Sequence, residues 1–295
     1  MIQTLQKEKL IYSFSKNHEP AIKLAAGSRI FIETYDCYRN QLKRPEDLYH
    51  LKPEEINPVT GPIYIESAEP GDILKVEIHR LQIAGEGVMT VRPGKGVLGH
   101  LVKDPEMKVI PISGNKALFN DRIHLPLNPM IGVIGVAPAG KAVPAGTPGS
   151  HGGNLDTLSI KEGAVLYLPV FTEGALFGLG DMHAAMGDGE VGISGIETSG
   201  TAEVSLHIIK KQPLAGPIVK NECSFSTLAS APTLHKAAHK AAEAMVDFLL
   251  PFSGLTQSEL IMLCSAAGRL QISQAVNPLA TVRFTMGTVP HFPEL

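Results

Sequence analysis

The segment from Gly178 to Glu190, GLGDMHAAMGDGE, places four ionisable side chains among glycine, alanine, methionine and leucine. Asp181 and His183 are separated by one residue, and so are Asp188 and Glu190. In an extended strand, residues two apart face the same side, so each pair can present both groups to one place. A carboxylate beside an imidazole is suited to metal ligation, or to a general base with the group that orients it.

The charge around this segment favours a bound cation. Taken one at a time, these residues also fit a half-buried histidine and ordinary turn carboxylates, and only their clustering indicates a site. Grouping carboxylates at the end of an apolar strand costs several kcal/mol unless they are paired or bind a cation. No lysine or arginine lies between Lys161 and Lys210 to neutralise them, although an arginine from a distant segment would also serve. The acidic residues of that interval are Glu162, Glu173, Asp181, Asp188, Glu190, Glu197 and Glu203.

Other polar residues could join such a site. Asn154 and Asp156 form a third pair of residues two apart, directly after two glycines. Glu66 ends the predicted strand GPIYIE, where it could point into a cleft or simply be solvated. Cys37, beside Asp36, is either a nucleophile or a small buried residue. The chain has no G-x-S-x-G elbow and no G-x-G-x-x-G or Walker-type loop, which disfavours a serine α/β-hydrolase and a nucleotide cofactor.

The elements that must position these groups are mostly strands. Apolar residues alternate with polar ones after a glycine turn in several segments, a pattern typical of half-buried strands. Thr172 to Gly174, between two apolar runs, predicts a tight hairpin. The glycine- and proline-rich segment 137–154 is either a linker or a functional loop, and its polar end, HGGN, favours the loop. The predicted strands are 24–36, 68–81, 128–139, 160–171, 202–210 and 280–286.

The last third of the chain changes character. Residues 233–249 place apolar side chains on one helical face, and a second helix is predicted from Thr256, within a TQSE capping box, to near Gly268. We therefore expect a β-rich body over residues 1–210 that carries the site. An α+β C-terminal portion over residues 211–295 should pack on that body.

Composition narrows the class of protein. The net charge of -3 gives no indication of nucleic-acid binding, and no apolar run approaches the roughly 20 residues needed to cross a membrane. The polar start of the chain does not resemble a signal peptide. Three scattered cysteines, Cys37, Cys223 and Cys264, fit a reducing compartment, so we expect a cytoplasmic protein that binds neither nucleic acid nor membrane.

Several motifs together resemble the acetamidase/formamidase family of metal-dependent amidases. They are HGGNLDT, GPIYIESAEPGDIL, LYLPVFTEGALFGLGDMHAAMGDGEVGISGIET, ETYD near the start and LQISQAVNPLATVRF near the end, so the resemblance spans nearly the whole chain. It implies a mainly β fold with a β-sandwich-like body, a homo-oligomer with a dimer favoured, and hydrolysis of short aliphatic amides of the formamide or acetamide type. The family's motif positions fall on Asp36, Glu66, Asn154, Asp156, Asp181, His183 and Glu190. One departure is Met186, where the family pattern has glutamine.

Combining the residues with this resemblance gives a specific hypothesis. Four side chains ligate a divalent metal, with zinc expected and calcium or manganese as alternatives: Asp36, Asp156, Asp181 and His183. Glu190 or Glu66 moves the proton, and Asn154 holds the amide or the developing oxyanion. Two other classes stay open. A cupin-like metal enzyme is disfavoured by the missing H-x-H pair, and a non-catalytic metal-binding relative has no need for so many carboxylates.

Overall fold

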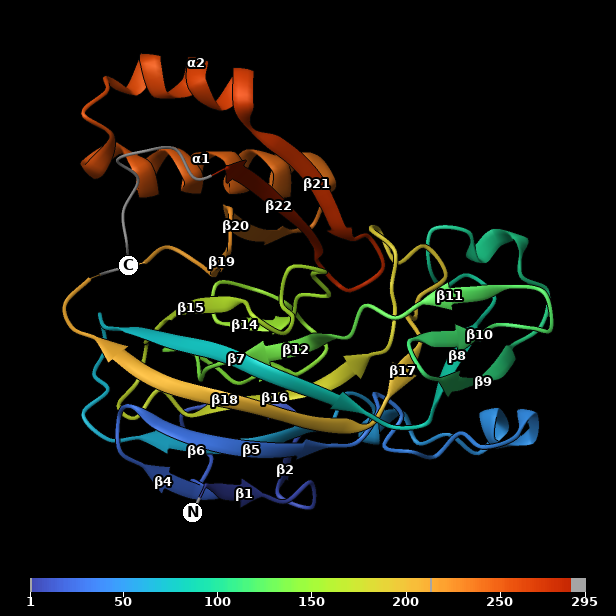
Figure 1. Cartoon of the computed structure of the whole chain (residues 1–295). Helices are drawn as coiled ribbons and strands as arrows, with labels where there is room; N and C mark the ends of the chain where they lie inside the picture. Colours follow the sequence, from blue (N-terminus) through green and yellow to red (C-terminus); the bar gives the residue numbers. More distant parts are fainter. Residues whose placement is uncertain (1, 213, 288–295) are drawn as a thin grey trace.

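Two β-sheets stack face to face and enclose the principal core (Figure 1). The computed structural model describes residues 2–212 and 214–287. Within that part the chain is mainly β-strand, with two α-helices near its C-terminal end. The predicted fold class, a β-sandwich-like body with an added α+β portion, is confirmed.

The first sheet has nine strands within the described residues. Neighbouring strands in it are antiparallel, except that β1 and β5 are parallel. In spatial order they are β1 (Gln3–Leu5), β5 (Ser28–Thr34), β18 (Gly200–Ile209), β7 (Ile73–Ile83), β15 (Val165–Pro169), β19 (Ile218–Asn221), β20 (Ser224–Ala231), β22 (Ala280–Gly287) and β21 (Arg269–Gln274).

The second sheet has eleven strands in the same described part. Its main path is β11 (His124–Pro126), β10 (Lys116–Leu118), β9 (Glu106–Ser113), β8 (Glu86–Val91), β17 (Glu197–Thr198), β16 (Phe177–His183), β12 (Met130–Gly135) and β14 (Gly152–Asn154). Strand β6 (Val59–Ile65) pairs with β16 and adds β2 (Leu10–Ile11) and β4 (Ile22–Leu24). A separate pair joins β3 (Ser13–Phe14) to β13 (Val143–Pro144).

Strands β12 and β16 are buried along their whole length, which explains their nearly continuous apolar sequence. Ile131 and Ile134 of β12 face the core between the sheets, together with residues such as Ile32 and Val204 of the first sheet. Val133, on the opposite face of β12, packs against Phe14 in a smaller cluster. Polar side chains at the ends of these strands are therefore surrounded by apolar structure.

The predicted hairpin around Thr172 to Gly174 is wrong. Strand β15 pairs with β7 and β19 in the nine-stranded sheet, whereas β16 pairs with β12, β17 and β6 in the other. The turn carries the chain from one sheet to the other, and Ala175 and Leu176 take the positive φ values of 58° and 54° there. The turn residues were recognised, but their spacing does not reveal which strands pair.

The glycine-rich segment 137–154 is built into the sandwich. It contributes β13 and β14, and Asn154 of β14 pairs with Val133 of β12. The loop interpretation of this segment therefore fits the structure better than the linker interpretation, because its end forms part of the second sheet.

The helices form a layer on the outer strands of the nine-stranded sheet (Figure 1). Helix α1 (Leu234–Ser253) begins at Thr233, whose side chain accepts from the Lys236 N–H, and ends at Gly254 with φ 66°. Helix α2 (Gln257–Ala267) begins with the predicted capping box of Thr256 and Glu259. None of the described helices combines the length and apolarity needed to cross a membrane.

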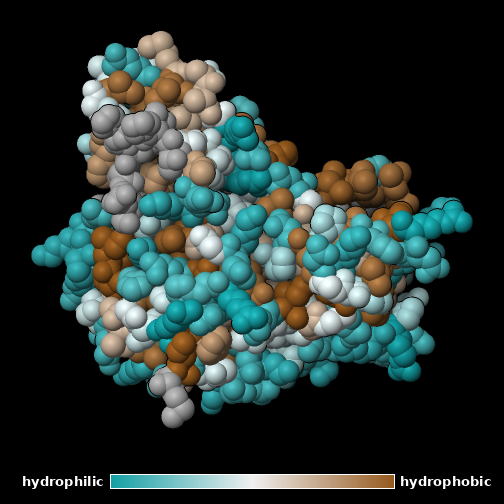
Figure 2. Space-filling model, in the orientation of Figure 1, coloured by the Kyte–Doolittle hydropathy of each residue, from teal (hydrophilic) through white to brown (hydrophobic). Residues whose placement is uncertain are grey.

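The nine-stranded sheet continues across residue 210, since β19 of the C-terminal portion pairs with β15 of the body. The two largest apolar clusters of the described residues lie in different places: one is between the sheets and the other is under α1 and α2. The outer surface of the helical layer keeps exposed apolar side chains, including Phe252, Ile261 and Met262, and Figure 2 shows apolar areas there at the top of the view. The expected division at residue 210 stays a prediction.

A bidentate ion pair ties the connection between β16 and β17 to the C-terminal portion. Both terminal nitrogens of the buried Arg283 guanidinium donate to the Asp188 carboxylate at 2.8 Å. Backbone hydrogen bonds from Gly189 N to Ser273 O and from Ala275 N to Gly189 O continue this connection. Asp188 is therefore neutralised by an arginine from a distant segment.

Replacing Asp188 by asparagine should lower the free energy of unfolding by about 1–3 kcal/mol, because the buried Arg283 loses its counter-charge. Urea denaturation of the wild type and the Asp188→Asn variant measures this loss. The exposed Asp104, for which no ion pair is found in the described residues, supplies the control: Asp104→Asn should change stability by less than about 0.5 kcal/mol. Equal effects of the two substitutions would contradict this role of the ion pair.

Candidate functional site

Five buried ionisable side chains from separate segments meet where β16 ends. Asp181 and His183 belong to β16, and Glu197 to the adjacent β17. Asp156 follows β14, and Glu190 lies in the connection between β16 and β17. Each of the five is 6% exposed or less. The structure therefore brings together Asp156, Asp181, His183 and Glu190, as the sequence predicted, and adds Glu197.

Three carboxylate oxygens face one ring nitrogen. Glu197 Oε2 lies 3.1 Å from His183 Nε2, Asp181 Oδ1 lies 3.3 Å from it, and Asp156 Oδ1 lies 3.8 Å from it. These three oxygens are buried, and none has a hydrogen-bond partner among the described residues. Burying such acceptors destabilises the folded state unless a hydrogen-bond donor or a cation binds them.

The backbone at the site is held in an uncommon conformation. Asp156, Asp181 and Glu190 have φ values of 41°, 54° and 47°, in the left-handed region that costs non-glycine residues about 1–3 kcal/mol each. Asp181 thus meets His183 as expected, but not through a simply extended strand. Gly132 of β12 lies beneath the carboxylates, where an added Cβ would come within 2.5 Å of Asp156 Oδ1. Only glycine leaves room for this arrangement.

Burial controls the proton affinity of the cluster. It raises the pKa of Glu197 to about 8 and that of Asp156 to about 6, and it raises the pKa of Glu190 well above its ordinary value. Burial alone would also raise the pKa of Asp181, but the neighbouring His183 lowers it. Glu197 therefore favours its protonated form near neutral pH, and a cation that binds beside it must displace that proton.

The imidazole of His183 responds in the opposite sense. Burial opposes its protonation, but the carboxylates of Glu197 and Asp181 outweigh that effect and raise the pKa of His183 well above its ordinary value. A positive charge at this point is strongly favoured by the surrounding oxygens. Either a protonated imidazole or a cation bound beside the neutral ring would supply the positive charge that these oxygens favour.

Two asparagines complete the surroundings of Asp156. Asn277, between β21 and β22, donates from Nδ2 to Asp156 Oδ2 at 2.6 Å and to the Asn154 carbonyl at 3.2 Å. The side-chain oxygen Asn154 Oδ1 is buried without a partner within the described part of the chain. Asn154 therefore offers an acceptor beside the cluster, whereas Asn277 fixes the orientation of Asp156.

Two predicted site residues lie differently from expectation. Asp36 is buried, but its Oδ1 accepts the backbone N–H groups of Tyr38 at 3.0 Å and Asn40 at 2.6 Å, so it holds a turn. Burial raises the pKa of Asp36 to about 6. Glu66 is exposed after β6 and is not among the residues that line the cavity of the site. Of the two alternatives for Glu66, the structure fits the solvated strand end, because the turn after β6 carries the residue to the surface.

Glu197, Asn277 and Cys37 also line the cavity of the site, although their positions in the sequence do not predict it. Donor atoms of Cys37, Asp181 and Glu197 lie within 4.8 Å of one another, as do those of Asp156, His183 and Glu190. Burial, followed by Glu197, raises the pKa of the Cys37 thiol well above its ordinary value, which disfavours a free thiolate nucleophile. Glu197 stood within a quoted motif, but nothing in its spacing distinguished it from other strand glutamates.

A small cavity of about 180 Å³ opens onto the cluster. Besides the carboxylates, its walls include Tyr38, Thr90, Arg92 and Lys95. A second, largely apolar cavity of about 560 Å³ shares the side chain of Glu190 and includes Met186. The departure from the family pattern at Met186 therefore lies beside the site and not within the carboxylate cluster.

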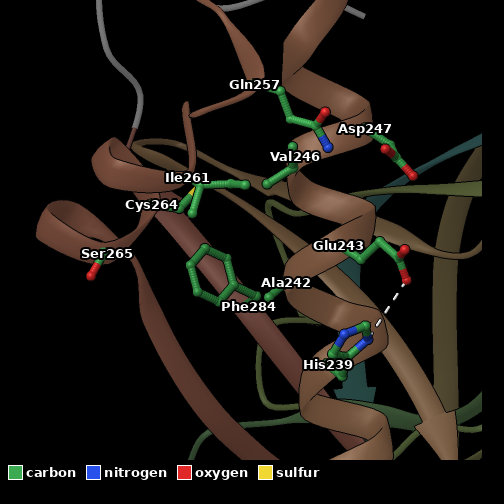
Figure 3. Close-up of a pocket in the computed structure, with 10 residues that line it drawn as sticks. All are labelled: His239, Ala242, Glu243, Val246, Asp247, Gln257, Ile261, Cys264, Ser265 and Phe284. Atoms are coloured by element: carbon green, nitrogen blue, oxygen red, sulfur yellow. Dashed lines mark ion pairs between the residues drawn. The ribbon is translucent and has the colours of Figure 1, made fainter. Parts of the chain in front are cut away.

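Another cavity, of about 430 Å³, lies between α1, α2 and β22 (Figure 3). Its charged side chains are on α1, where His239 and Glu243 form an exposed ion pair at 3.8 Å. In the described residues, neither of the two groups of donor atoms that could hold a metal ion lies there. The candidate chemistry belongs to the smaller cavity at the end of β16.

His151, in the glycine-rich segment before β14, is a buried histidine of another kind. Its ring packs edge-on against Phe14 at a centroid distance of 5.3 Å, and its Nε2 has no partner in the described structure. Burial lowers the pKa of His151 from 6.5 to about 4, so the ring is neutral at physiological pH.

Comparison with known proteins gives a consistent result. A family model described as the acetamidase/formamidase family matches residues 3–145 and 139–287. The crystal structure of an acetamidase from Bacillus halodurans has a TM-score of 0.95 and 43% identity, over 96% of this chain and 97% of that one. A structure described as a predicted acetamidase/formamidase from Thermoanaerobacter tengcongensis has a TM-score of 0.95 and 44% identity, over 97% and 96% of the two chains.

More distant curated relatives have related names. A putative formamidase of Schizosaccharomyces pombe is 26% identical over 251 residues, which is 62% of this chain and 60% of that protein. An acetamidase of Mycolicibacterium smegmatis is 24% identical over 257 residues, 64% of this chain and 63% of that protein. The matches therefore span less than two thirds of the length of these two relatives.

His151 should make the protein less stable as the pH falls. Its pKa is about 4 when folded and 6.5 when unfolded, so its contribution is complete above pH 6.5 and is lost as the pH falls through 4. The loss approaches about 3 kcal/mol, and urea denaturation between pH 7 and 4 measures it. The His151→Gln variant should show a shallower decline than the wild type, whereas His50→Gln, at an exposed position, should not. An unchanged pH dependence in His151→Gln would contradict the burial argument.

Proposed function

Because this chain belongs to the acetamidase/formamidase family, we propose that it is a metal-dependent amidohydrolase of short aliphatic amides. The reaction adds water across the amide C–N bond and gives a carboxylate and ammonia. The observation that carries the proposal is the set of three buried carboxylate oxygens within 3.8 Å of His183 Nε2, for which no other partner is found among the described residues. Four donor atoms converging in a buried site are suited to a divalent cation.

The donor spacing supports this assignment. Ligand atoms about 2.0–2.1 Å from a tetrahedral zinc ion are separated from one another by about 3.3 Å. The separations of 3.1 and 3.3 Å from His183 Nε2 to Glu197 and Asp181 match that value, and the 3.8 Å to Asp156 is slightly longer. We therefore assign His183, Asp181, Glu197 and Asp156 as the residues that hold the ion, with Glu197 in place of Asp36. Asp181 and Glu197 come from one group of mutually close donors, and His183 and Asp156 from the other.

Zinc is the first candidate for the ion. An imidazole nitrogen among carboxylates suits zinc or manganese better than calcium, which prefers oxygen ligands alone. Calcium and manganese remain the alternatives for the metal analysis.

The chain's own residues perform the remaining steps. A divalent cation supplies a Lewis acid that polarises the amide carbonyl and makes water a stronger nucleophile. Glu190, which lines the cavity beside the cluster, accepts a proton from the attacking water and returns it to the departing nitrogen. Asn154 Oδ1, an acceptor without a partner in the described structure, binds an N–H of the substrate amide. The exposed Glu66 takes no part.

Two further expectations belong to this proposal. The protein acts in the cytoplasm, which the free thiols of Cys37, Cys223 and Cys264 support. It also assembles as a homo-oligomer, with a dimer favoured, for which the exposed apolar surface of the helical layer offers an interface.

Ammonia release from formamide, acetamide and propionamide tests the proposal, together with metal analysis of the purified protein. Chelation should abolish the activity, and added zinc should restore it. The His183→Ala variant should lose bound metal and lower kcat/KM by about 100-fold or more, because the ligand set loses its nitrogen.

His235, exposed in the first turn of α1, provides the matched control. The His235→Ala variant should keep the metal content and turnover of the wild type. Full activity of His183→Ala, or activity that persists after complete metal removal, is the result that the proposal does not allow.

A further inference from the structure

Two cationic side chains line the small cavity together with the carboxylate cluster. Arg92 directly follows β8, and Lys95 lies in the turn that comes next. No nitrogen of either side chain lies within 4 Å of a carboxylate oxygen in the described structure, although four carboxylates line the same cavity. These cations are therefore not used to neutralise the cluster by direct ion pairing.

The guanidinium of Arg92 does not use all of its hydrogen-bond donors within the described residues. Its Nη2 is buried and has no hydrogen-bond partner among the residues that the structure describes. An unpaired buried donor on a charged group is more costly than an unpaired neutral one. Arg92 Nη2 could therefore donate a hydrogen bond to an acceptor bound in the cavity. A planar carboxylate is a well-suited acceptor for a guanidinium.

The backbone fixes this cationic wall relative to the proposed proton-transfer residue. Lys95 N donates to Arg92 O at 3.1 Å, and Val97 N donates to Val191 O at 2.9 Å. Gly96, with φ 75°, allows the close approach, because an added Cβ would lie 2.8 Å from Val191 O. Val191 directly follows Glu190, so the turn that carries the cations and the loop that carries Glu190 are held together.

Groups of opposite charge therefore line one cavity. They are the carboxylates of Asp156, Asp181, Glu190 and Glu197 and the cations of Arg92 and Lys95. Tyr38 and Thr90, joined by a 2.7 Å hydrogen bond, also line it. A volume of about 180 Å³ restricts the occupant to a short molecule.

We propose that the substrate is a short amide whose acyl part ends in a carboxylate, such as a monoamide of a small dicarboxylic acid. Arg92 and Lys95 bind that carboxylate while the amide group lies at the carboxylate cluster. This inference rests on the proposed amidohydrolase activity and narrows its substrate class. A neutral alkyl amide would leave Arg92 Nη2 without an acceptor, whereas the dicarboxylic monoamide completes it.

Steady-state ammonia release tests this with the metal-loaded protein. Succinamate and malonamate are compared with butyramide, a neutral amide of similar length. We expect the wild type to prefer the anionic amides by at least about 10-fold in kcat/KM. The Arg92→Met variant should lower the ratio of succinamate to butyramide kcat/KM by about 100-fold, mainly through KM, because a buried charge pair is lost.

Matched variants separate charge from structure. Arg92→Lys should recover part of the preference, since it keeps the charge without the planar guanidinium. Lys95→Met should lower the preference less than Arg92→Met, because Lys95 is exposed. Lys103→Met, an exposed cation elsewhere on the same segment, should leave the preference unchanged. Equal turnover of succinamate and butyramide by the wild type overturns the inference, and so does an equal loss for both substrates in Arg92→Met.

A binding measurement keeps the inference testable if turnover fails. Succinate, which carries the same carboxylate, should bind the metal-loaded wild type more tightly than butyrate in calorimetry, and Arg92→Met should abolish that difference. Failure to release ammonia from any amide would contradict the proposed function alone. Equal binding of succinate and butyrate would contradict the role of Arg92.

Discussion

Burying several carboxylates around one imidazole is the constraint on which the rest of the structure depends. Each negative charge removed from water must be compensated, and the oxygens that face His183 Nε2 have no other partner in the described chain. The protein maintains the arrangement with residues in left-handed backbone conformations and with a glycine, Gly132, beneath them. Such strain persists only where the surrounding structure imposes it, and here the strands β12 and β16 are buried along their whole length.

Residues near the C-terminal end of the described chain support the cluster and its loop. The C-terminal portion supplies Asn277, which orients Asp156, and Arg283, which neutralises Asp188. Asp188 and Glu190 are two residues apart, but they have separate functions: one anchors the loop to β22, and the other stays in the site. Residues near the C-terminal end are therefore part of the site's support, although the clustered side chains lie between Asp156 and Glu197.

Sequence reasoning succeeded where the relevant contacts are local. The pairing of Asp181 with His183, the capping box at Thr256 and the main strands follow from spacing and alternation. The sequence does not predict contacts that depend on which strands pair. The chain after β15 crosses to the other sheet, and Glu197 reaches His183 because β17 pairs with β16. The spacing of residues also does not predict how two turns place their carboxylates. The Asp36 carboxylate accepts backbone N–H groups within its own turn, and the turn after β6 carries Glu66 to the surface. Asn277 and Arg92 are distant in sequence from the other site residues, so only the folded chain shows that they belong to the same cavity.

The central claim is that these buried oxygens and His183 surround a common cation, and diffraction at the zinc absorption edge tests it most directly. Crystals of the protein grown with one equivalent of zinc should give an anomalous peak about 2.0–2.1 Å from His183 Nε2 and from oxygens of Asp181 and Glu197. A structure with the zinc bound only elsewhere, and with these carboxylates protonated and hydrogen-bonded to one another around the imidazole, would contradict it.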